Sequence, residues 1–254
     1  MKKITKILFF VGMLITVILM VLILQKHWLL EKEVLDLKQV QAQIPIETVE
    51  LINNQTKILQ KYENLYNENN DLIGWIKIDG TNINYPVMYT PSNKNFYLHK
   101  NWEKQESKIG LPYLDERCNI ENSDNLIIYA HNVKGDKMFG VLKKYKNEEH
   151  YKNHKLIKFD TLYEEQQYEI ISVFITKVFY NNENADEDFL YYNYLNFENI
   201  ETYNDFIENI KQKSFYNTEV LSNYGDKFIT LSTCDYTYEN ARLVVVAVKL
   251  NNNE

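Results

Sequence analysis

The feature that most constrains this chain is an apolar run near its N-terminus, from Ile7 to Leu24, in which Thr16 is the only polar member of 18 residues. A helix of this length spans the hydrocarbon core of a bilayer. No polar stripe interrupts the run, which argues against a helix packed on a water-soluble core. A cleavable signal peptide has a shorter apolar core and a small-residue cleavage site, whereas the polar and bulky residues 25–29 follow here. The run therefore predicts an uncleaved membrane anchor.

The charges that flank the run predict its orientation. Lys2, Lys3 and Lys6 precede it, so the positive-inside rule places the N-terminus in the cytoplasm and everything after Lys26 outside the cell. The expected location is the cell membrane, with a single membrane-spanning segment. Without Lys26 and these three lysines, the chain keeps 24 Lys and Arg residues against 35 Asp and Glu residues, a net charge of −11. So acidic an exterior argues against nucleic acid or anionic lipid headgroups as the partner.

Composition divides the chain into three regions. Residues 1–27 form the N-terminal cytoplasmic tip and the transmembrane anchor. Residues 28–70 are rich in Glu, Lys, Gln and Leu with apolar residues at helical spacing, and Pro45 divides them into two helices of a lead-in segment. Residues 71–254 form the extracellular domain, which is large enough for a hydrophobic core of its own.

Short β-prone segments separated by turn signals fill the third region. Eight such segments with few long helices between them favour a mainly β fold, a closed or nearly closed eight-stranded barrel, over a βαβ fold. One helix breaks the pattern, because apolar residues at i, i+3 and i+4 spacing predict it at Phe197 to Ser214, in the long connection before the last two strands. The predicted strands are 73–78, 83–88, 110–114, 125–130, 156–159, 168–178, 227–233 and 242–250.

Three chemically distinctive side chains stand at the ends of these strands. Cys234 ends one strand pattern and Arg242 opens the next after a short polar loop, while His131 ends the strand pattern that begins at Asn125. A thiol attacks only as thiolate and needs a nearby cation or proton acceptor to be useful at neutral pH. One Cys, one His and one Arg at strand ends are the parts of a thiol acyl-transfer site.

Arginine usage supports a special role for Arg242. The chain has 26 lysines and only two arginines, so a generic positive charge here would almost always have been lysine. Ser232 and Thr233 precede the thiol and alternate faces along the strand, so both are candidate substrate-binding residues and we expect one of them to help line the substrate groove. No metal or cofactor is expected, because His150 and His154 are four residues apart but no Cys or carboxylate pattern completes a site with them.

The second cysteine, Cys118, lies in a polar stretch that is typical of a surface turn. A disulfide between Cys118 and Cys234 is the structural alternative to a reactive thiol, because the predicted domain faces an oxidising compartment. The position of Cys234 at the end of a buried strand pattern favours a free thiol instead.

The residues 230–234, Thr-Leu-Ser-Thr-Cys, resemble the TLxTC segment of the sortases, the membrane-anchored cysteine transpeptidases of Gram-positive bacteria. Arg242 falls where the essential arginine of that family follows on the next strand, and residues 129–132 resemble its histidine strand end. Softer features resemble class B sortases: the helical lead-in, the segment 74–81 with 84–87, the Met-Phe-Gly helix at 138–140 and the helix before the cysteine strand. The resemblance implies a sortase-type closed barrel with N-terminal helices.

The resemblance also implies a mechanism and partners. Cys234 attacks a backbone carbonyl of a C-terminal sorting signal on a secreted protein and forms a thioacyl-enzyme. His131 protonates the leaving amine and later takes a proton from the incoming amine. Arg242 holds the substrate carbonyl and stabilises the oxyanion with its fixed fork of donors. The acyl group passes to an amine of the cell wall, such as a peptidoglycan precursor or cross-bridge.

Other functions remain open from the sequence. A cell-wall cysteine peptidase or amidase would use a similar thiol and imidazole but let water resolve the acyl-enzyme, and a pilin-polymerising sortase would use a lysine of another protein subunit. A non-catalytic anchored adhesin would use both cysteines structurally. Cell-wall cysteine peptidases usually carry the Cys before the His, at the start of a helix. In this chain the His comes first and the Cys ends a strand. That order favours a sortase.

Overall fold

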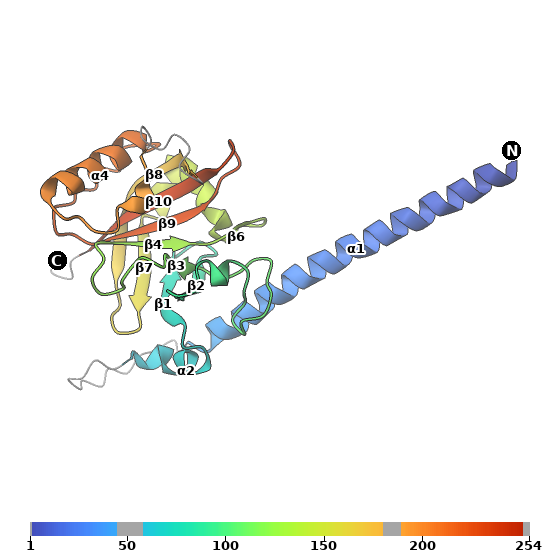
Figure 1. The fold of residues 1–254 in the computed structure, drawn as a ribbon, viewed down its shortest axis with the longest axis horizontal. Coiled ribbons are helices and arrows are strands. Elements are labelled where there is room, and N and C mark those ends of the chain that lie inside the picture. Colours follow the sequence, from blue (N-terminus) through green and yellow to red (C-terminus); the bar gives the residue numbers. More distant parts are fainter. Residues whose placement is uncertain (1, 45–57, 180–188, 251–254) are drawn as a thin grey trace. The chain divides into compact units, whose positions relative to one another are not determined.

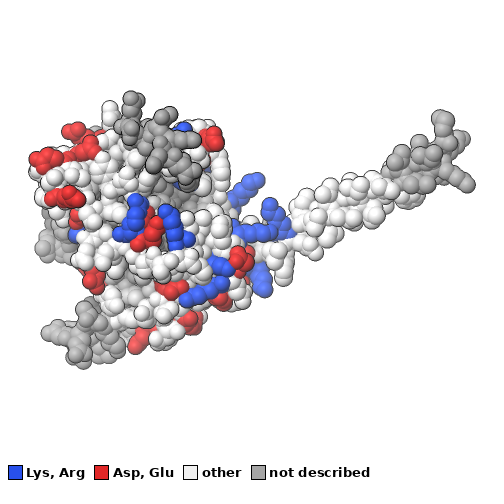
Figure 2. Space-filling model, viewed as in Figure 1, with Lys and Arg blue, Asp and Glu red and all other residues white. Residues whose placement is uncertain are grey.

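The computed structural model describes residues 2–44, 58–179 and 189–250. The chain forms two units, residues 1–42 and residues 43–254. The first unit is one continuous helix, α1 (Lys2–Ala42). Its side chains from Phe9 to Leu24 are exposed, and Figure 2 shows this stretch as an uninterrupted surface without charged side chains. By length and composition, α1 can cross a membrane, which agrees with the expected anchor.

The second unit is built on a closed barrel of eight strands in the order β1-β2-β3-β4-β9-β10-β8-β7 (Figure 1). Neighbouring strands are antiparallel except for two parallel pairs, β2 with β3 and β4 with β9. The expectation of a mainly β, closed eight-stranded barrel is confirmed. The barrel strands are β1 (Leu72–Lys77), β2 (Asn84–Met88), β3 (Tyr113–Leu114), β4 (Asn125–Tyr129), β7 (Leu156–Thr161), β8 (Gln167–Lys177), β9 (Phe228–Cys234) and β10 (Ala241–Lys249).

Shorter elements lie between the barrel strands. The strand pair β5 and β6 forms a small two-stranded sheet directly after β4. The 3-10 segment η2 continues from that sheet and leads into α3. The elements outside the barrel are α2 (Gln60–Glu68), η1 (Phe96–Leu98), β5 (Asn132–Val133), β6 (Lys137–Met138), η2 (Phe139–Lys146), α3 (Glu148–Asn153), η4 (Tyr191–Asn193) and α4 (Ile200–Lys213).

Strand β10 runs through the densest part of the barrel core. It pairs with β8 on one side and with β9 on the other along almost its whole length. Its residues Val244 to Ala247 have no exposed surface. Three of these four residues are valines, and β-branched side chains pack well on both faces of a buried strand. The ends of β9 and β10 are therefore fixed by a long, fully paired ladder.

Helix α4 lies in the connection before β9 and covers the barrel beside β8 (Figure 1). Phe206 and Ile210 on its inner face have no exposed surface. The helix begins at Ile200 rather than at the predicted Phe197, because the side chain of Asn199 accepts a hydrogen bond from the backbone N–H of Thr202 and caps the helix. The helix expected before the cysteine strand is confirmed.

The turn predicted around Cys118 is present at Glu116 and Arg117, but the expectation that Cys118 itself lies on the surface is wrong. Cys118 is only 2% exposed, and its thiol lies 3.6 Å from the carbonyl oxygen of Asn125. The turn is polar at its other positions, but the cysteine itself points inward. Cys118 and Cys234 are both free thiols, and burial raises the pKa of the Cys118 thiol to about 12.

Candidate active site

The three predicted catalytic residues lie on three neighbouring strands. Arg242 on β10 is the direct register partner of Cys234 on β9. Strand β4 is parallel to β9, with Tyr129 opposite Ser232, so two more residues along each strand bring His131 beside Cys234. Neighbouring strands lie about 4.8 Å apart, and directly opposed side chains project from the same face. The register pairs the thiol with the guanidinium and, continued past its last pair, predicts the imidazole beside them, in one row at one end of the barrel.

This row lies in a groove of about 400 Å³. All five predicted site residues, catalytic and substrate-binding, contribute to its lining. The groove extends from Cys234 toward the turn after β3 and toward η4. The lining residues are Lys94, Asn95, Leu98, Tyr113, Asp115, Glu116, Arg117, Tyr129, Ala130, His131, Val178, Phe179, Tyr191, Tyr192, Ser232, Thr233, Cys234 and Arg242.

The His131 imidazole is half-buried and held in a defined orientation. Its Nε2 atom lies 2.9 Å from the carbonyl oxygen of Leu98. A carbonyl only accepts, so Nε2 carries the proton and Nδ1 is left as the nitrogen that can exchange one. Burial lowers the pKa of His131 below its usual 6.5; the Leu98 hydrogen bond opposes this, and the nearby His99 adds to the lowering. The His131 and His99 ring centroids are 5.6 Å apart.

Two charged residues lie next to Cys234: Arg242 faces it on β10, and Asp235 follows it in the chain. The guanidinium of Arg242 lines the groove, and its Nη1 donates to the carbonyl of Ala241 at 3.1 Å. The carboxylate of Asp235 forms an ion pair with Lys146 at 2.6 Å and accepts from the backbone N–H of Thr237 at 2.9 Å. Asp235 therefore holds the β9–β10 loop and is not the partner that orients His131.

The hydroxyl groups of Ser232 and Thr233 are both engaged within the protein. Ser232 Oγ lies 2.7 Å from the hydroxyl of Tyr191, and Thr233 Oγ1 donates to the carbonyl of Ala130 at 2.8 Å. Both residues are almost fully buried. They belong to the groove wall, and a substrate-binding role for them stays a prediction.

The network that builds the far wall of the groove was not predicted from the sequence. Arg117 donates twice to the buried carboxylate of Asp115, from Nε at 2.9 Å and from Nη2 at 2.7 Å. Tyr129 donates to the same carboxylate at 3.0 Å, and Arg117 also donates to the carbonyl of Tyr192 at 2.8 Å. Arginine is rare in this chain, and that rarity singled out Arg242. The same rarity applies to Arg117 and is the sequence signal that could have identified it.

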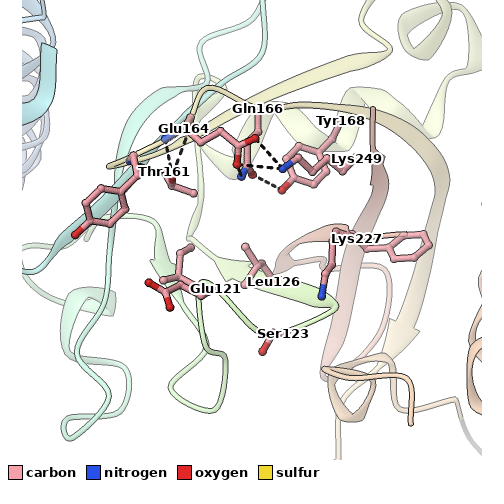
Figure 3. A pocket seen from close by; sticks show the side chains of 12 residues that line it. Glu121, Ser123, Leu126, Thr161, Glu164, Gln166, Tyr168, Lys227 and Lys249 are labelled. Carbon is pink, nitrogen blue, oxygen red and sulfur yellow. Dashed lines mark hydrogen bonds and ion pairs between the residues drawn. The ribbon is translucent and has the colours of Figure 1, made fainter. Parts of the chain in front are cut away.

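A second cavity, of about 460 Å³, lies at the opposite ends of β4, β9 and β10. Figure 3 shows Glu164 bonded to Gln166 and Lys249 on one side of it, with Lys227 and Ser123 on the other. Lys227 forms an ion pair with Asp124. Neither a cysteine nor a histidine is among the described residues that line this cavity, so the candidate chemistry belongs to the groove at Cys234.

Comparison with known proteins agrees with this geometry. The sequence model of the sortase domain matches residues 76–250. Sortase B of Staphylococcus aureus (strain NCTC 8325 / PS 47) is 33% identical over 199 residues, which cover 78% of this chain and 77% of the relative. The chain belongs to the sortase family. As a sortase it is a cysteine transpeptidase, and its relatives place it in class B.

Solved structures also resemble this sortase over nearly the whole chain. A Staphylococcus aureus sortase B–substrate complex is 30% identical, with a TM-score of 0.73, and the match covers 88% of this chain and 98% of the other. A sortase B complexed with triglycine is 30% identical, with a TM-score of 0.74, and the match covers 88% and 99% of the two chains. The shared fold is the closed barrel with the helix before the cysteine strand.

Proposed function

We propose that this sortase cleaves a C-terminal sorting signal of secreted proteins and transfers the new acyl end to an amine of the cell wall, with Cys234, His131 and Arg242 as its catalytic residues. The observation that carries the proposal is the register row of these three side chains in one groove. A nucleophile, a proton carrier and a fixed cation at neighbouring strand ends are the groups that acyl transfer between two amines requires.

In the first step, the Cys234 thiolate, beside a protonated His131, attacks a backbone carbonyl carbon of the sorting signal. The carbon–nitrogen bond breaks, a thioester forms, and the downstream peptide leaves as an amine that takes its proton from His131. Arg242 donates to the carbonyl oxygen while that oxygen carries negative charge. Ser232 and Thr233 contribute to the wall against which the signal lies.

In the second step, an incoming amine attacks the thioester carbon and gives up a proton to His131. A new amide bond forms, the carbon–sulfur bond breaks, and the Cys234 thiolate and the protonated His131 with which the first step began are regenerated. The two steps exchange one amide for another, so the reaction needs no external energy source and no cofactor. The complex of a related sortase B with triglycine supports an amine at the end of a glycine peptide as the acceptor class.

The organisation along the chain serves this reaction at the cell surface. In the proposed arrangement residues 1–27 hold the protein in the membrane, residues 28–70 form a helical lead-in, and residues 71–254 form the extracellular catalytic domain. The apolar length of α1 supports the anchor, and the lysines before the apolar run support a cytoplasmic N-terminus.

The test is cleavage of a quenched fluorogenic peptide library by the full-length protein, with triglycine added as the acceptor. The wild-type protein should yield products ligated to triglycine, which mass spectrometry separates from hydrolysis products. Cys234→Ala should abolish cleavage because no other described residue in the groove supplies a thiol. Cys118→Ser is the matched control and should retain activity, since the Cys118 thiol lies buried against the carbonyl of Asn125.

Two outcomes would contradict the proposal. Full activity of Cys234→Ala would remove the thiol from the mechanism. Hydrolysis products alone, at every triglycine concentration and also with lysine or diaminopimelate as the acceptor, would indicate a peptidase or amidase instead.

A further inference from the structure

The backbone pairing between β4 and β9 ends just before the two catalytic strand ends meet. Tyr129 and Ser232 form the last register pair, and the hydrogen bond that follows, from the N–H of Ala130 to the carbonyl of Ser232, is already long at 3.3 Å. His131 and Cys234 therefore lie two residues beyond the last pair of the regular ladder. Something other than that ladder must fix their separation.

Two side chains bridge the strands at this point. Thr233, the residue before the nucleophile, donates to the carbonyl of Ala130, the residue before the histidine, at 2.8 Å. Asn132, the residue after the histidine, donates from Nδ2 to the carbonyl of Cys234 at 2.8 Å. The two bonds run in opposite directions and bracket the His131 and Cys234 pair on both sides.

Asn132 is itself rigidly held. It pairs with Met138 in the β5–β6 sheet, and the N–H of Phe139 donates to the carbonyl of His131 at 3.0 Å. Met138 is buried with φ of 49° and ψ of −128°, a backbone conformation that L residues rarely adopt. A Cβ on Gly140 would lie 2.2 Å from the carbonyl oxygen of Val133, so the backbones of these two residues approach too closely for a side chain at position 140.

Cys234 is fixed independently on its other edge. Arg242 is its register partner on β10, and the N–H of Asp235 donates to the carbonyl of Ala241 at 3.0 Å. Loss of the Asn132 bond would therefore leave strand β9 in the barrel. It would remove only the link between the backbone carbonyl of Cys234 and the chain segment that carries His131.

We propose that Asn132 is a positioning residue of this sortase, which holds the peptide carbonyl of Cys234 at a fixed place relative to His131. The inference rests on the proposed catalytic roles of those two residues. Proton exchange between an imidazole and the groups reacting at a thiol depends on their separation and direction, and misplacement by about 1 Å costs about a hundredfold in rate. Asn132 supplies this geometry through a neutral donor, without a charge beside the thiol.

The experiment compares Asn132→Asp, Asn132→Ala and Asn132→Gln in the full-length protein. Asp has nearly the shape of Asn but presents an acceptor to the Cys234 carbonyl, so bulk is kept and the bond is lost. We expect kcat for peptide cleavage to fall at least tenfold in Asn132→Asp and Asn132→Ala, with KM within twofold and a melting temperature close to that of the wild type. Asn132→Gln keeps the carboxamide on a longer arm and should recover part of kcat.

The matched control is Asn209→Asp, which removes the same kind of bond, from Nδ2 to the carbonyl of Asp205 at 2.8 Å, on the outer helix α4. Its kcat should equal that of the wild type. Wild-type kcat in Asn132→Asp would overturn the positioning role, as would a fall in kcat that merely follows loss of folded protein. Cys234→Ala in the same assay separates the two proposals, because activity in that variant would refute the catalytic assignment itself.

Discussion

Arg242 is one of only two arginines among the 28 basic residues of this sortase, and its proposed task depends on guanidinium geometry rather than on charge. A planar fork can donate two parallel hydrogen bonds to a developing oxyanion, whereas a lysine ammonium acts as a point charge on a flexible arm. Arg242→Lys should therefore lower kcat/KM about 100-fold, which is the usual cost of losing an oxyanion donor. Steady-state kinetics of peptide cleavage measure this.

A suitable comparison for that variant is Arg242→Ala, which removes both the charge and the fork. If charge alone were important, Arg242→Lys would be far more active than Arg242→Ala. Wild-type turnover in Arg242→Lys would restrict the residue to a structural role at the start of β10.

The protonation of His131 provides a second prediction for a single residue. Burial lowers the pKa of His131, and His99 adds to the lowering because the two rings are neighbours. His99→Gln should raise the pKa of His131 toward 6.5, and ring NMR signals followed against pH measure it. His154→Gln is the control, because its ring stacks on His150 rather than on His131. An unchanged His131 titration in His99→Gln would show that the two imidazoles do not interact.

The sign of the stability effect follows from the same shift. Between the folded pKa of His131 and its usual 6.5, the unfolded chain binds more protons than the folded chain. The contribution of His131 to the free energy of unfolding is therefore present above pH 6.5 and is lost as the pH falls through the folded value. The lowered pKa also makes the imidazolium a minority form at neutral pH.

Sequence reasoning finds some of these side chains and not others, for a physical reason. Cys234, His131 and Arg242 stand where apolar strand patterns stop or start, so local periodicity marks them. The carbonyl of Leu98 and the hydroxyl of Tyr191 reach the groove from segments that are distant in sequence, and no local pattern marks such a contact. Asn132 follows the histidine directly, but only the parallel register of β4 and β9 gives it a partner.

At the scale of elements, the far wall of the groove depends on Arg117, which pairs with Asp115 in its own turn and donates a hydrogen bond to the carbonyl of Tyr192 in η4. Arg117 therefore joins the turn after β3 to η4. Arg117→Lys should remove the paired hydrogen bonds, lower the free energy of unfolding by about 1–2 kcal/mol, and loosen the wall. We expect KM for peptide substrates to rise about threefold to tenfold while kcat changes little, because Arg117 lines the groove but its hydrogen bonds go to Asp115 and Tyr192 rather than to the proposed catalytic residues.

The pH dependence of that stability loss identifies its cause. Burial raises the pKa of Asp115, but the Arg117 hydrogen bonds outweigh burial and hold it below its usual range. The pair therefore stabilises the fold above about pH 3.9, the usual pKa of a free Asp, and this contribution is lost as the pH falls through the folded value. Urea unfolding at a series of pH values should show a difference between wild type and Arg117→Lys at pH 7 that shrinks as the pH falls below about 3.9. Lys94→Gln, which breaks an exposed pair with Glu116, is the control and should have little effect at either pH.

The elements themselves were predictable to the extent that their signals are local. All eight barrel strands and helix α4 were expected near their observed positions, since alternating or continuous apolar runs mark them. Strand β3 has only two residues, and one parallel bridge from Tyr113 to Met88 joins it to β2. Strand order, the two parallel pairs and the β5–β6 sheet depend on tertiary pairing, so the sequence alone could not provide them.

The whole molecule joins an apolar helix that is long enough to cross a membrane to an acidic domain, and its proposed topology is testable in cells. The apolar run of α1 has lysines on its N-terminal side, so the positive-inside rule predicts a cytoplasmic N-terminus. With different epitope tags added at the two ends, protease treatment of intact protoplasts should destroy the C-terminal tag and spare the N-terminal tag. The control is the triple variant Lys2→Glu, Lys3→Glu and Lys6→Glu, in which the charge bias is reversed and a fraction of molecules should insert the opposite way. Loss of the N-terminal tag and protection of the C-terminal tag in the wild type would place the catalytic groove inside the cell, where it has no access to the cell wall.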